Sequence, residues 1–550
     1  MIASLFGTLA AQLPAGLPAA DVYAPGSGDF DALIPMPVLL PLLGAALSVV
    51  FARMRTAQRV ISIVVLIGMV ANNVILLTRI DEATGDAVGG VAVSQAGGWV
   101  APLGISLVVD RLAAMMLVVS SLMLISVLVY AIGQHAEERR FAAFHPVYLV
   151  LAAGVSASFI TGDLFNLFVA FEMMLVSSYV LLTLGGRAGQ VRSGMSYVVI
   201  SLIASTFFIT ALALIYSAVG TVNMAELSER MPEMPSGVQS GFSLLLIAVF
   251  GIKAGIFPLF FWLPDSYPTA PNAVTAIFAG LLTKVGVYAI IRTQLLLFPS
   301  DSQQGTVLLI VAGCTMLAGV LGALSHDDLQ RILSFHIVSH IGYMIMGLGL
   351  FTLAGVAGAV FYVVHHIVVK TALFLVAGLV ERKSGSDRLS RVGGLVRSAP
   401  MISILFALPA LSIAGFPPFS GFVAKFALVS AAIEARQWGI VVVSLLVSLL
   451  TMYVMGRIWS SVFWGRPEDG VVSDRLEPGA TKVPVLMTAA TVVVVGLSVA
   501  LFVFAGPLYD LAERAAADLL NPQSYIDGVL GHSDAGGATS ISTSTSGAGG

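Results

Sequence analysis

Four of the chain's six lysines lie inside long apolar stretches, where a fixed charge is costly. They are Lys253, Lys284, Lys370 and Lys425. A charge at the centre of a membrane helix costs about 2.5–3.5 kcal/mol, so four lysines facing lipid would cost on the order of 10 kcal/mol. Buried lysine can lose its proton, whereas arginine stays charged. Snorkelling and buried ion pairs explain single lysines, but the set of four predicts interior amines that carry protons reversibly.

One acidic residue, Glu172, lies in the middle of the apolar segment DLFNLFVAFEMMLVSSYVLL (163–182). A carboxylate near a lysine keeps the ammonium charged, and it lets the lysine discharge when it moves away or takes up a proton. Glu172 therefore predicts a group that tunes a lysine, with a static Glu–Lys pair as the alternative. Asp163 begins the same segment, where we expect it to act as a helix N-cap.

Histidines accompany one of these lysines. His366 and Lys370 are four residues apart in YVVHHIVVKTALF, so they share a helix face, and histidine titrates nearest neutral pH. His336 and His340 form a second pair at the same spacing, and we expect His340 to form a hydrogen bond between helices. A zinc site needs three or four ligands and the sequence has no HExxH motif, so we expect no metal site.

The composition indicates which elements must position these side chains. Charged residues make up only 10% of the 550 residues, whereas soluble domains carry about 25%, and the mean hydropathy is +0.96. A membrane-spanning helix needs about 20 mostly apolar residues. The sequence predicts an all-α polytopic membrane protein with about fourteen transmembrane helices, near 34–52, 60–78, 105–132, 143–161, 163–184, 195–218, 240–262, 270–292, 305–324, 331–350, 353–380, 401–431, 438–463 and 483–506.

Charge and cysteine content narrow the function. A formal net charge of −3 excludes nucleic-acid binding through a basic surface. The single cysteine, Cys314, excludes disulfides within the chain and cysteine-ligated iron–sulfur clusters. The sequence has no P-loop and no GxGxxG motif after a strand. We therefore expect no cofactor and no enzymatic activity.

Two of the predicted helices, the seventh and the twelfth, contain helix breakers. They read IKAGIFPLFFWLPDSYPTAP (252–271) and LSIAGFPPFSGFVAKF (411–426), with breaks at Pro258, Gly415, Pro417 and Pro418. Unpaired backbone inside a membrane is tolerated only where it is buried or lines a wet cavity. The segments AGIFPLF and AGFPPF resemble each other and lie five helices apart, so they have opposite orientations. This pattern predicts inverted repeats with broken helices on the ion path, with simple packing kinks as the alternative.

Basic residues are distributed unevenly over the loops between the predicted helices. Odd-numbered loops contain 16 lysines and arginines, whereas the even-numbered loops and the C-terminal tail contain 5. Basic loops stay on the cytoplasmic side of a membrane. We therefore expect a multi-pass protein of the cell membrane with both termini on the non-cytoplasmic side.

These motifs occur together in a known family. The chain resembles the antiporter-like, proton-pumping subunits shared by respiratory complex I and Mrp-type multisubunit Na⁺/H⁺ antiporters, over roughly residues 100–465. The motifs that carry the resemblance are Glu172, Lys253 ahead of Pro258 and WLPD (262–265), Lys284, DLQRILSF (328–335), IGYM (341–344), His366 with Lys370, and GFPPFSGF with Lys425. Within the family the chain is most similar to the D-type subunit of Mrp antiporters. Gln330 and His340 depart from the usual pattern, and we expect both near a cytoplasmic loop or a helix packing surface, so the departures leave the implied relay unchanged.

The resemblance implies a domain arrangement and a role for each candidate residue. The arrangement is an N-terminal extension (1–33), three helices (34–142), two inverted five-helix repeats (143–293 and 305–464), a last helix (483–509) and a C-terminal tail with a disordered end (510–550). In the implied relay, Glu172 tunes Lys253, which takes up a proton from one side. Lys284 and His366 pass it laterally, with Lys370 as a further member, and Lys425 exchanges it with the other side.

The sequence therefore predicts a proton-translocating subunit of a cation/proton antiporter complex in the lipid bilayer. The transported ions would be H⁺ and Na⁺, and the partners would be other subunits of the Mrp antiporter complex, with no nucleic acid. Since the sequence shows no closed carboxylate cage for Na⁺, sodium could cross in a neighbouring subunit. One alternative is a proton-pumping subunit of complex I or a membrane-bound hydrogenase, and another is an inactive scaffold.

Overall fold

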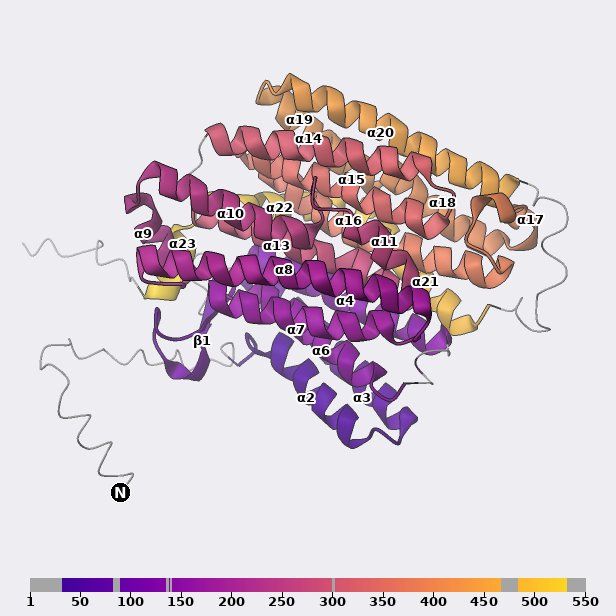
Figure 1. The fold of residues 1–550 in the computed structure, drawn as a ribbon, viewed down its shortest axis with the longest axis horizontal. Coiled ribbons are helices and arrows are strands. Elements are labelled where there is room, and N and C mark those ends of the chain that lie inside the picture. Colours follow the sequence, from indigo (N-terminus) through magenta and orange to yellow (C-terminus); the bar gives the residue numbers. More distant parts are fainter. Residues whose placement is uncertain are drawn as a thin grey trace, which may run out of the picture.

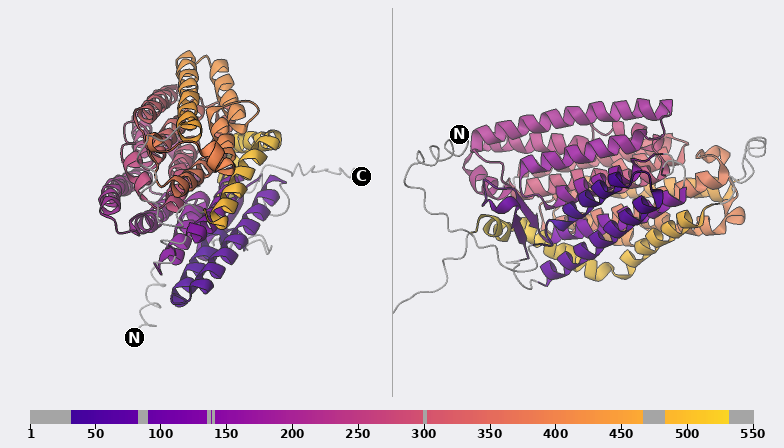
Figure 2. Two further views of the ribbon diagram at one scale, coloured as in Figure 1. Left: turned by 90° about the vertical axis from the view of Figure 1, so that its right-hand side faces the viewer. Right: turned by 90° about the horizontal axis from the view of Figure 1, so that it is seen from below.

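The computed structural model describes residues 32–82, 90–134, 138, 141–298, 302–465 and 483–531. The described residues leave out most of the predicted N-terminal extension and residues 532–550 of the predicted tail. They also leave out five of the basic loop residues from which we predicted the orientation: Arg139, Arg140, Arg466, Arg475 and Lys482. The described chain consists mainly of helices that run side by side (Figure 1). Figure 2 shows the N-terminal pair, in indigo, at one edge of this bundle and the orange helices at the opposite edge.

The first half of the chain forms the helices that carry Glu172, Lys253 and Lys284. Its elements are α2 (Met36–Val50), α3 (Arg55–Asp81), α4 (Arg111–Gln134), α6 (Phe144–Ile160), α7 (Leu164–Thr183), α8 (Ala188–Val219), α9 (Met224–Arg230), η3 (Met231–Glu233), α10 (Ser236–Ala254), α11 (Trp262–Ser266), η4 (Tyr267–Thr269), α12 (Asn272–Ile277), η5 (Phe278–Leu282) and α13 (Thr283–Leu296). As expected, Asp163 caps α7, because its carboxylate accepts a hydrogen bond from the Asn166 backbone N–H at 2.8 Å.

The second half carries the histidines, Lys370 and Lys425. Its elements are α14 (Ser302–Ser325), α15 (Leu329–Gly349), α16 (Leu353–Ser384), η6 (Leu389–Arg391), α17 (Leu395–Ser398), α18 (Pro400–Ala414), α19 (Ser420–Glu434), α20 (Trp438–Ile458), η7 (Trp459–Trp464), α21 (Val485–Val503), α22 (Ala505–Leu520) and α23 (Gln523–Leu530). The 32-residue helix α16 is the centre of the fold, since it packs against α4, α12, α15, α18, α19, α21 and α22. Its apolar segment is entirely buried.

A short β-hairpin precedes α4. Strands β1 (Ala92–Gln95) and β2 (Ser106–Val109) pair antiparallel, from Ala92 opposite Val109 to Gln95 opposite Ser106, and η2 (Ala96–Gly98) follows β1. Because the hairpin ends directly before Asp110, it fixes where α4 begins.

Within the described residues, eleven helices are long and apolar enough to cross a membrane. Three shorter apolar helices accompany them: α2, α6 and α18. Many large apolar side chains point outward from α8 and α20, including Leu202 and Phe207 on α8 and Leu446 and Tyr453 on α20. Apolar surfaces of this extent indicate contact with lipid or with other membrane proteins. The chain is therefore a membrane protein with several apolar crossings.

Two helices stop where the sequence contains its breakers. Helix α10 ends at Ala254, and Gly255 adopts the left-handed conformation with φ of 81° before the chain reaches Pro258 and α11. Helix α18 ends at Ala414 in the same way, with Gly415 at φ of 84°, and α19 begins two residues after Pro418. Glycine adopts this conformation without steric cost, which makes it the usual residue after a helix C-terminus.

The described part of the predicted C-terminal tail is helical and packed. Helix α22 buries Ala512, Ala515, Ala516 and Leu519, a spacing that places all four on one face, and this helix packs against α4, α13 and α16. Sequence analysis assigned no structure there because the buried face is made mostly of alanine, which gives only a weak hydropathy signal.

Candidate functional site

Glu172 and Lys253 are joined through a serine hydroxyl. Lys253 Nζ donates to Ser205 Oγ at 3.3 Å and to the Ser201 carbonyl at 3.4 Å, and Ser205 Oγ in turn donates to Glu172 Oε1. The three side chains come from α10, α8 and α7. The amine also lies 5.8 Å from the centre of the Phe171 ring. Glu172 can therefore act on the charge of Lys253 without binding it directly.

Each helix interruption has a lysine beside it. Lys253 belongs to the last turn of α10, and its amine bonds to Ser201 and Ser205 of the neighbouring helix α8. Lys425 lies on α19, beyond the break, but its side chain reaches back and donates to the Ala414 carbonyl at the end of α18, at 3.2 Å. Carbonyls at a helix C-terminus lack helical partners and carry partial negative charge. Both interruptions therefore have a lysine, but of the two amines only that of Lys425 bonds to the end of the preceding helix.

Lys425 is surrounded by hydroxyl-bearing residues of α15 and α20. Its amine donates to Ser448 Oγ at 3.1 Å and lies 5.5 Å from the centre of the Tyr343 ring. The Tyr343 hydroxyl donates to the Ser444 carbonyl at 2.6 Å. The Lys425 side chain is therefore buried, but it is bonded to polar atoms that can bind either form of the amine.

Lys284 and Lys370 lie between these two ends. Lys284 is fully buried and donates to the Ala279 carbonyl, which belongs to the π-helical turn η5. Such turns leave backbone groups free and occur often at functional sites. Lys370, also fully buried, donates to the Leu333 carbonyl at 3.4 Å. The two amines are close enough to interact electrostatically.

A cluster of aromatic rings, which we call the His/Tyr cluster, connects these lysines with Lys425. Its members are His336, His340, Tyr343, Tyr362, His365 and His366. The ring centres of His340 and His366 are 5.4 Å apart, and those of Tyr343 and Tyr362 are also 5.4 Å apart. Helices α15 and α16 supply all six side chains, so the cluster forms where these two helices pack.

Hydrogen bonding within the His/Tyr cluster is incomplete. His340 Nδ1 lies 2.5 Å from Tyr362 Oη, and His365 Nδ1 lies 2.9 Å from Ser420 Oγ. Both ring nitrogens of His336 and His366, and Nε2 of His340, are buried without a protein partner. Buried polar atoms need a partner, and water fills that role in protein interiors. The cluster is therefore suited to proton transfer through bridging water.

The structure brings the six sequence-predicted residues into two groups. Glu172 and Lys253 form one group. In the other group, His366 is a member of the His/Tyr cluster, and Lys284, Lys370 and Lys425 lie around that cluster. Within the described part of the chain, no hydrogen bond joins Lys253 with Lys284. Helices α10 and α13 nevertheless pack closely, with Gly286 against the Ala254 backbone. Any transfer between the two groups must use water.

The serines and tyrosines of the site were not predicted from the sequence. His340 was expected near a loop or a helix packing surface, and it is fully buried where α15 and α16 pack, at the middle of the His/Tyr cluster. The expected hydrogen bond between helices is present, to Tyr362. The spacing of His336, His340 and Tyr343 places the three on one helix face, a signal that could have identified the cluster.

Gln330, the other departure from the family pattern, lies in a separate polar group at the far end of α16. Its side-chain amide donates to Asn272 Oδ1 at 2.8 Å and to Glu381 Oε2 at 3.1 Å, and the Asn272 amide donates to the same carboxylate at 2.9 Å. This group joins α12, α15 and α16 near their ends.

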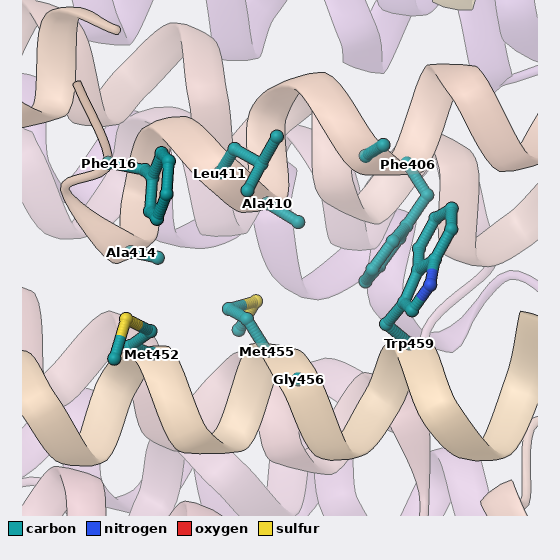
Figure 3. Close-up of a pocket in the computed structure, with 10 residues that line it drawn as sticks. Phe406, Ala410, Leu411, Ala414, Phe416, Met452, Met455, Gly456 and Trp459 are labelled. Atoms are coloured by element: carbon teal, nitrogen blue, oxygen red, sulfur yellow. The ribbon is translucent and has the colours of Figure 1, made fainter. Parts of the chain in front are cut away.

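A large groove near the second interruption is apolar. It has a volume of about 310 Å³ and lies between α18 and α20 (Figure 3). None of the residues that line the groove has an ionisable side chain. They are Phe406, Ala407, Ala410, Leu411, Ala414, Phe416, Met452, Met455, Gly456 and Trp459. The groove therefore offers an ion no ligand. The described residues also contain no group of three or more His, Cys, Asp or Glu side chains that could hold a metal.

Comparisons with known proteins agree on one family. The family model described as NADH:quinone oxidoreductase/Mrp antiporter, TM matches residues 161–451, a range that contains all six candidate residues. The chain is 41% identical to the D subunit of the Na⁺/H⁺ antiporter of Alkalihalophilus pseudofirmus, over 90% of this chain and 99% of that protein. It is 35% identical to the D subunit of a probable K⁺/H⁺ antiporter of Rhizobium meliloti, over 92% of this chain and 99% of that protein.

A solved structure supports the same assignment. The fold is similar to a chain in the structure of the Mrp complex from Dietzia sp. DQ12-45-1b, with a TM-score of 0.84, 32% sequence identity, and coverage of 92% of this chain and 100% of that chain. Identity above 30% over nearly full length, together with the matching fold, is sufficient to assign the family. The chain belongs to the membrane-subunit family shared by Mrp antiporters and NADH:quinone oxidoreductase, and within it to the D-type subunits of Mrp antiporters.

Proposed function

We propose that this chain is the proton-translocating subunit of a multisubunit monovalent cation/proton antiporter. The observation that carries this proposal is the placement of two lysines beside the two helix interruptions, with further buried lysines and the His/Tyr cluster between them. Burial without a carboxylate bonded to the amine leaves lysine able to release its proton. A buried line of such groups has no structural advantage over apolar packing, so transport explains it better than stability does.

In this proposal each candidate residue has a defined part. Glu172 sets the charge state of Lys253 through Ser205, and Lys253 takes up a proton from one side of the membrane. Lys284 and His366 relay the proton laterally, Lys370 tunes this step electrostatically, and Lys425 exchanges the proton with the other side. Water bridges the distances that side chains do not span, because hydrogen bonds require donor–acceptor distances near 3 Å.

The proposed architecture has fourteen membrane crossings. The eleven long apolar helices together with α2, α6 and α18 supply this number. Residues 143–293 and 305–464 form two inverted repeats, whose broken helices carry Pro258 in one copy and Gly415, Pro417 and Pro418 in the other. The left-handed glycines Gly255 and Gly415, each ending a helix beside a lysine, support the repeat assignment, as does the resemblance of AGIFPLF to AGFPPF.

The proposed location is the cell membrane, with both termini on the non-cytoplasmic side. The basic residues in the last turn of α16 and just beyond it, including Arg382, Lys383 and Arg388, favour a cytoplasmic position for that helix end. The proposed partners are the other subunits of an Mrp complex, as in the Dietzia assembly. No ATP-binding or redox motif occurs in this chain, so the ion gradient is the energy source, worth about 2.3 kcal/mol per charge for 100 mV.

The proposed exchanged cation is sodium, because the Alkalihalophilus relative is named as part of a Na⁺/H⁺ antiporter. The Rhizobium relative, named for K⁺, makes potassium the competing choice. Exchange measured separately with Na⁺ and K⁺ distinguishes them. The competing function is a proton-pumping subunit of a redox complex, which the family description includes. Flavin and iron–sulfur absorption in the purified complex would favour that alternative.

The decisive experiment measures Na⁺/H⁺ exchange in everted vesicles that contain the whole complex. The variants are Lys253→Ala, Lys253→Arg and Glu172→Ala, and Glu233→Ala in the exposed turn η3 is the matched control. We expect all three relay variants to lose exchange, including the arginine variant, because arginine does not release its proton. Full exchange in both alanine variants at relay positions would refute the proposal.

Assembly must be measured on the same variants. Blue-native gels report whether each variant enters the complex. Loss of exchange in fully assembled complexes supports proton translocation by this chain. If exchange stays intact while assembly changes, the chain is an inactive scaffold.

A further inference from the structure

A second polar column runs from Lys284 along α13, away from the His/Tyr cluster. Lys284, Tyr288 and Arg292 are spaced four residues apart, so they lie on one face of the helix. Eight residues correspond to a rise of about 12 Å along an α-helix. Arg292 Nη2 donates to Tyr288 Oη at 3.1 Å, and the Tyr288 hydroxyl donates to the Phe159 carbonyl at 2.6 Å. The column points to the membrane face opposite the basic end of α16.

The column ends in a buried ion pair. The two terminal nitrogens of Arg292, Nη1 and Nη2, bind the Asp110 carboxylate at 2.6 and 2.8 Å, and both side chains are buried. Asp110 also accepts from the Ala113 backbone N–H at 2.8 Å, so it is fixed at the start of α4. The guanidinium lies between the rings of Tyr288 and Tyr525, with its carbon 5.4 Å from each ring centre. Arg292 is therefore held in one position by contacts from three elements.

The C-terminal helices cover this ion pair. Arg111 Nη1 binds Asp518 of α22 at 2.7 Å, and Arg514 of α22 binds Asp81 of α3 at 2.8 Å. A small cavity beneath α22 and α23 is lined by Asp110, Arg292, Asp518 and Tyr525, among others, and the buried Tyr525 hydroxyl has no protein partner there. The ion pair thus borders a polar space at the outer end of the column.

We infer that Arg292, held by Asp110, is an electrostatic seal that closes the outward end of the Lys284 column. Arginine keeps its proton at all physiological pH values, so Arg292 cannot act as a carrier. Its guanidinium has only N–H donors, so it offers an arriving proton no acceptor, and its charge adds to the barrier, as an arginine does in other selective pores. The seal makes a proton on Lys284 move laterally towards the His/Tyr cluster rather than leak outward. This inference rests on the proposed relay and its proposed orientation.

The test is the passive proton conductance of proteoliposomes that contain the whole complex, measured with a pH-sensitive dye under an imposed potential and without Na⁺. We expect Arg292→Gln to raise the leak several-fold, because the column then reaches the outer cavity without a fixed charge. Arg292→Lys should stay tight, because the lysine remains charged beside Asp110. The double variant Arg292→Gln/Lys284→Met should return to the wild-type leak, because the column loses its inner end.

Arg230→Gln is the matched control, since this arginine lies on the same proposed side of the membrane, in an ion pair with Glu226, and is 47% exposed. It should not leak. Asp110→Asn is a second variant, expected to leak because it releases the guanidinium. The proposed seal would be overturned if Arg292→Gln and Asp110→Asn assemble without a leak. It would also be overturned if the leak persists in the double variant Arg292→Gln/Lys284→Met. Failure of both Arg292→Gln and Asp110→Asn to assemble would overturn it too, because the pair would then be a folding contact.

The leak and the exchange assays separate the two proposals. If Lys253→Ala keeps full exchange, the relay is wrong whatever the leak of Arg292→Gln. If Lys253→Ala loses exchange while Arg292→Gln assembles and stays tight, the relay stands and the seal fails.

Discussion

The four candidate lysines share one property: their amines bond to oxygens that carry no formal charge. Lys253 and Lys425 bind hydroxyls and carbonyls, while Lys284 and Lys370 bind carbonyls. Among the described residues, no ion pair includes any of the four. A bound carboxylate would hold each lysine protonated. Neutral oxygens keep the two forms of the amine closer in free energy, which a reversible carrier requires.

Ser205 bridges Glu172 and Lys253 by hydrogen bonds, so under the proposed relay its removal should slow exchange. A hydrogen bond to a charged group is worth about 1.5–3 kcal/mol, and each 1.36 kcal/mol corresponds to about a tenfold change in rate. We therefore expect Ser205→Ala to lower exchange roughly tenfold without loss of assembly. Thr206→Ala is the matched control, because Thr206 is exposed and binds only the Leu202 carbonyl of its own helix, at 2.9 Å. Equal exchange in both variants would argue against the bridge.

At the scale of elements, the sequence predicted the parts of the site that depend on local pattern. Lysines inside apolar runs, a mid-helix Glu172 and glycine–proline breaks are all visible along the chain. The bond from Lys425 back to Ala414 was not predictable, because it depends on how far a side chain folds across the break. The bridge through Ser205 and the place of His340 in the His/Tyr cluster were not predicted because both depend on which helices become neighbours. These three features depend on how the helices pack, and the sequence alone does not predict that packing.

The second interruption requires a glycine for two separate reasons. Gly415 has a φ of 84°, and an added Cβ would lie 3.0 Å from Lys425 Cδ and 3.4 Å from its Nζ. We expect Gly415→Ala to cost about 1–2 kcal/mol for the left-handed backbone, and to lower exchange further by displacing the amine. Thermal unfolding and exchange are measured together. In the control, Gly439→Ala, the new Cβ meets nothing within 4 Å, so both properties should stay near wild type.

A charged cluster fixes the connection between α4 and α6. Glu138 accepts from Arg59 at 2.7 and 2.9 Å, and His145 Nε2 lies 3.1 Å from the same carboxylate. Burial alone would raise the pKa of Glu138, but the hydrogen bonds from His145 and Arg59 outweigh it and lower the pKa from 4.5 to about 2. The ionised form is therefore stabilised by folding. This contribution is complete above pH 4.5 and is lost as the pH falls towards 2.

Glu138→Gln should consequently destabilise the protein by the same amount throughout the neutral range. We expect a loss of about 1–3 kcal/mol, because buried donors of Arg59 and His145 lose a charged acceptor. The measurement is thermal unfolding of wild type and variant at pH 8, 7 and 6, with the exposed Glu82→Gln as control. No difference in unfolding temperature between wild type and Glu138→Gln at any of the three pH values would contradict a stabilising role of this carboxylate.

At the scale of the whole molecule, the number of crossings decides whether the two chain ends lie on the same side of the membrane. The three shorter apolar helices determine whether that number is even. Helix α18 has 15 residues and is about 22 Å long, less than the roughly 30 Å hydrocarbon core, but α19 continues beyond the break and supplies the missing length. Helix α2 has the same number of residues and packs along α3 and α6.

If α2, α6 and α18 all cross, the eleven longer helices become fourteen crossings, and the two chain ends lie on one side. If all three fail to cross, the number is odd and the ends lie on opposite sides. We expect epitope tags placed before α2 and after α23 both to be cleaved by protease in right-side-out vesicles and both to be protected in everted ones. Tags on opposite sides would mean an odd number of crossings, which contradicts the proposed topology of fourteen crossings.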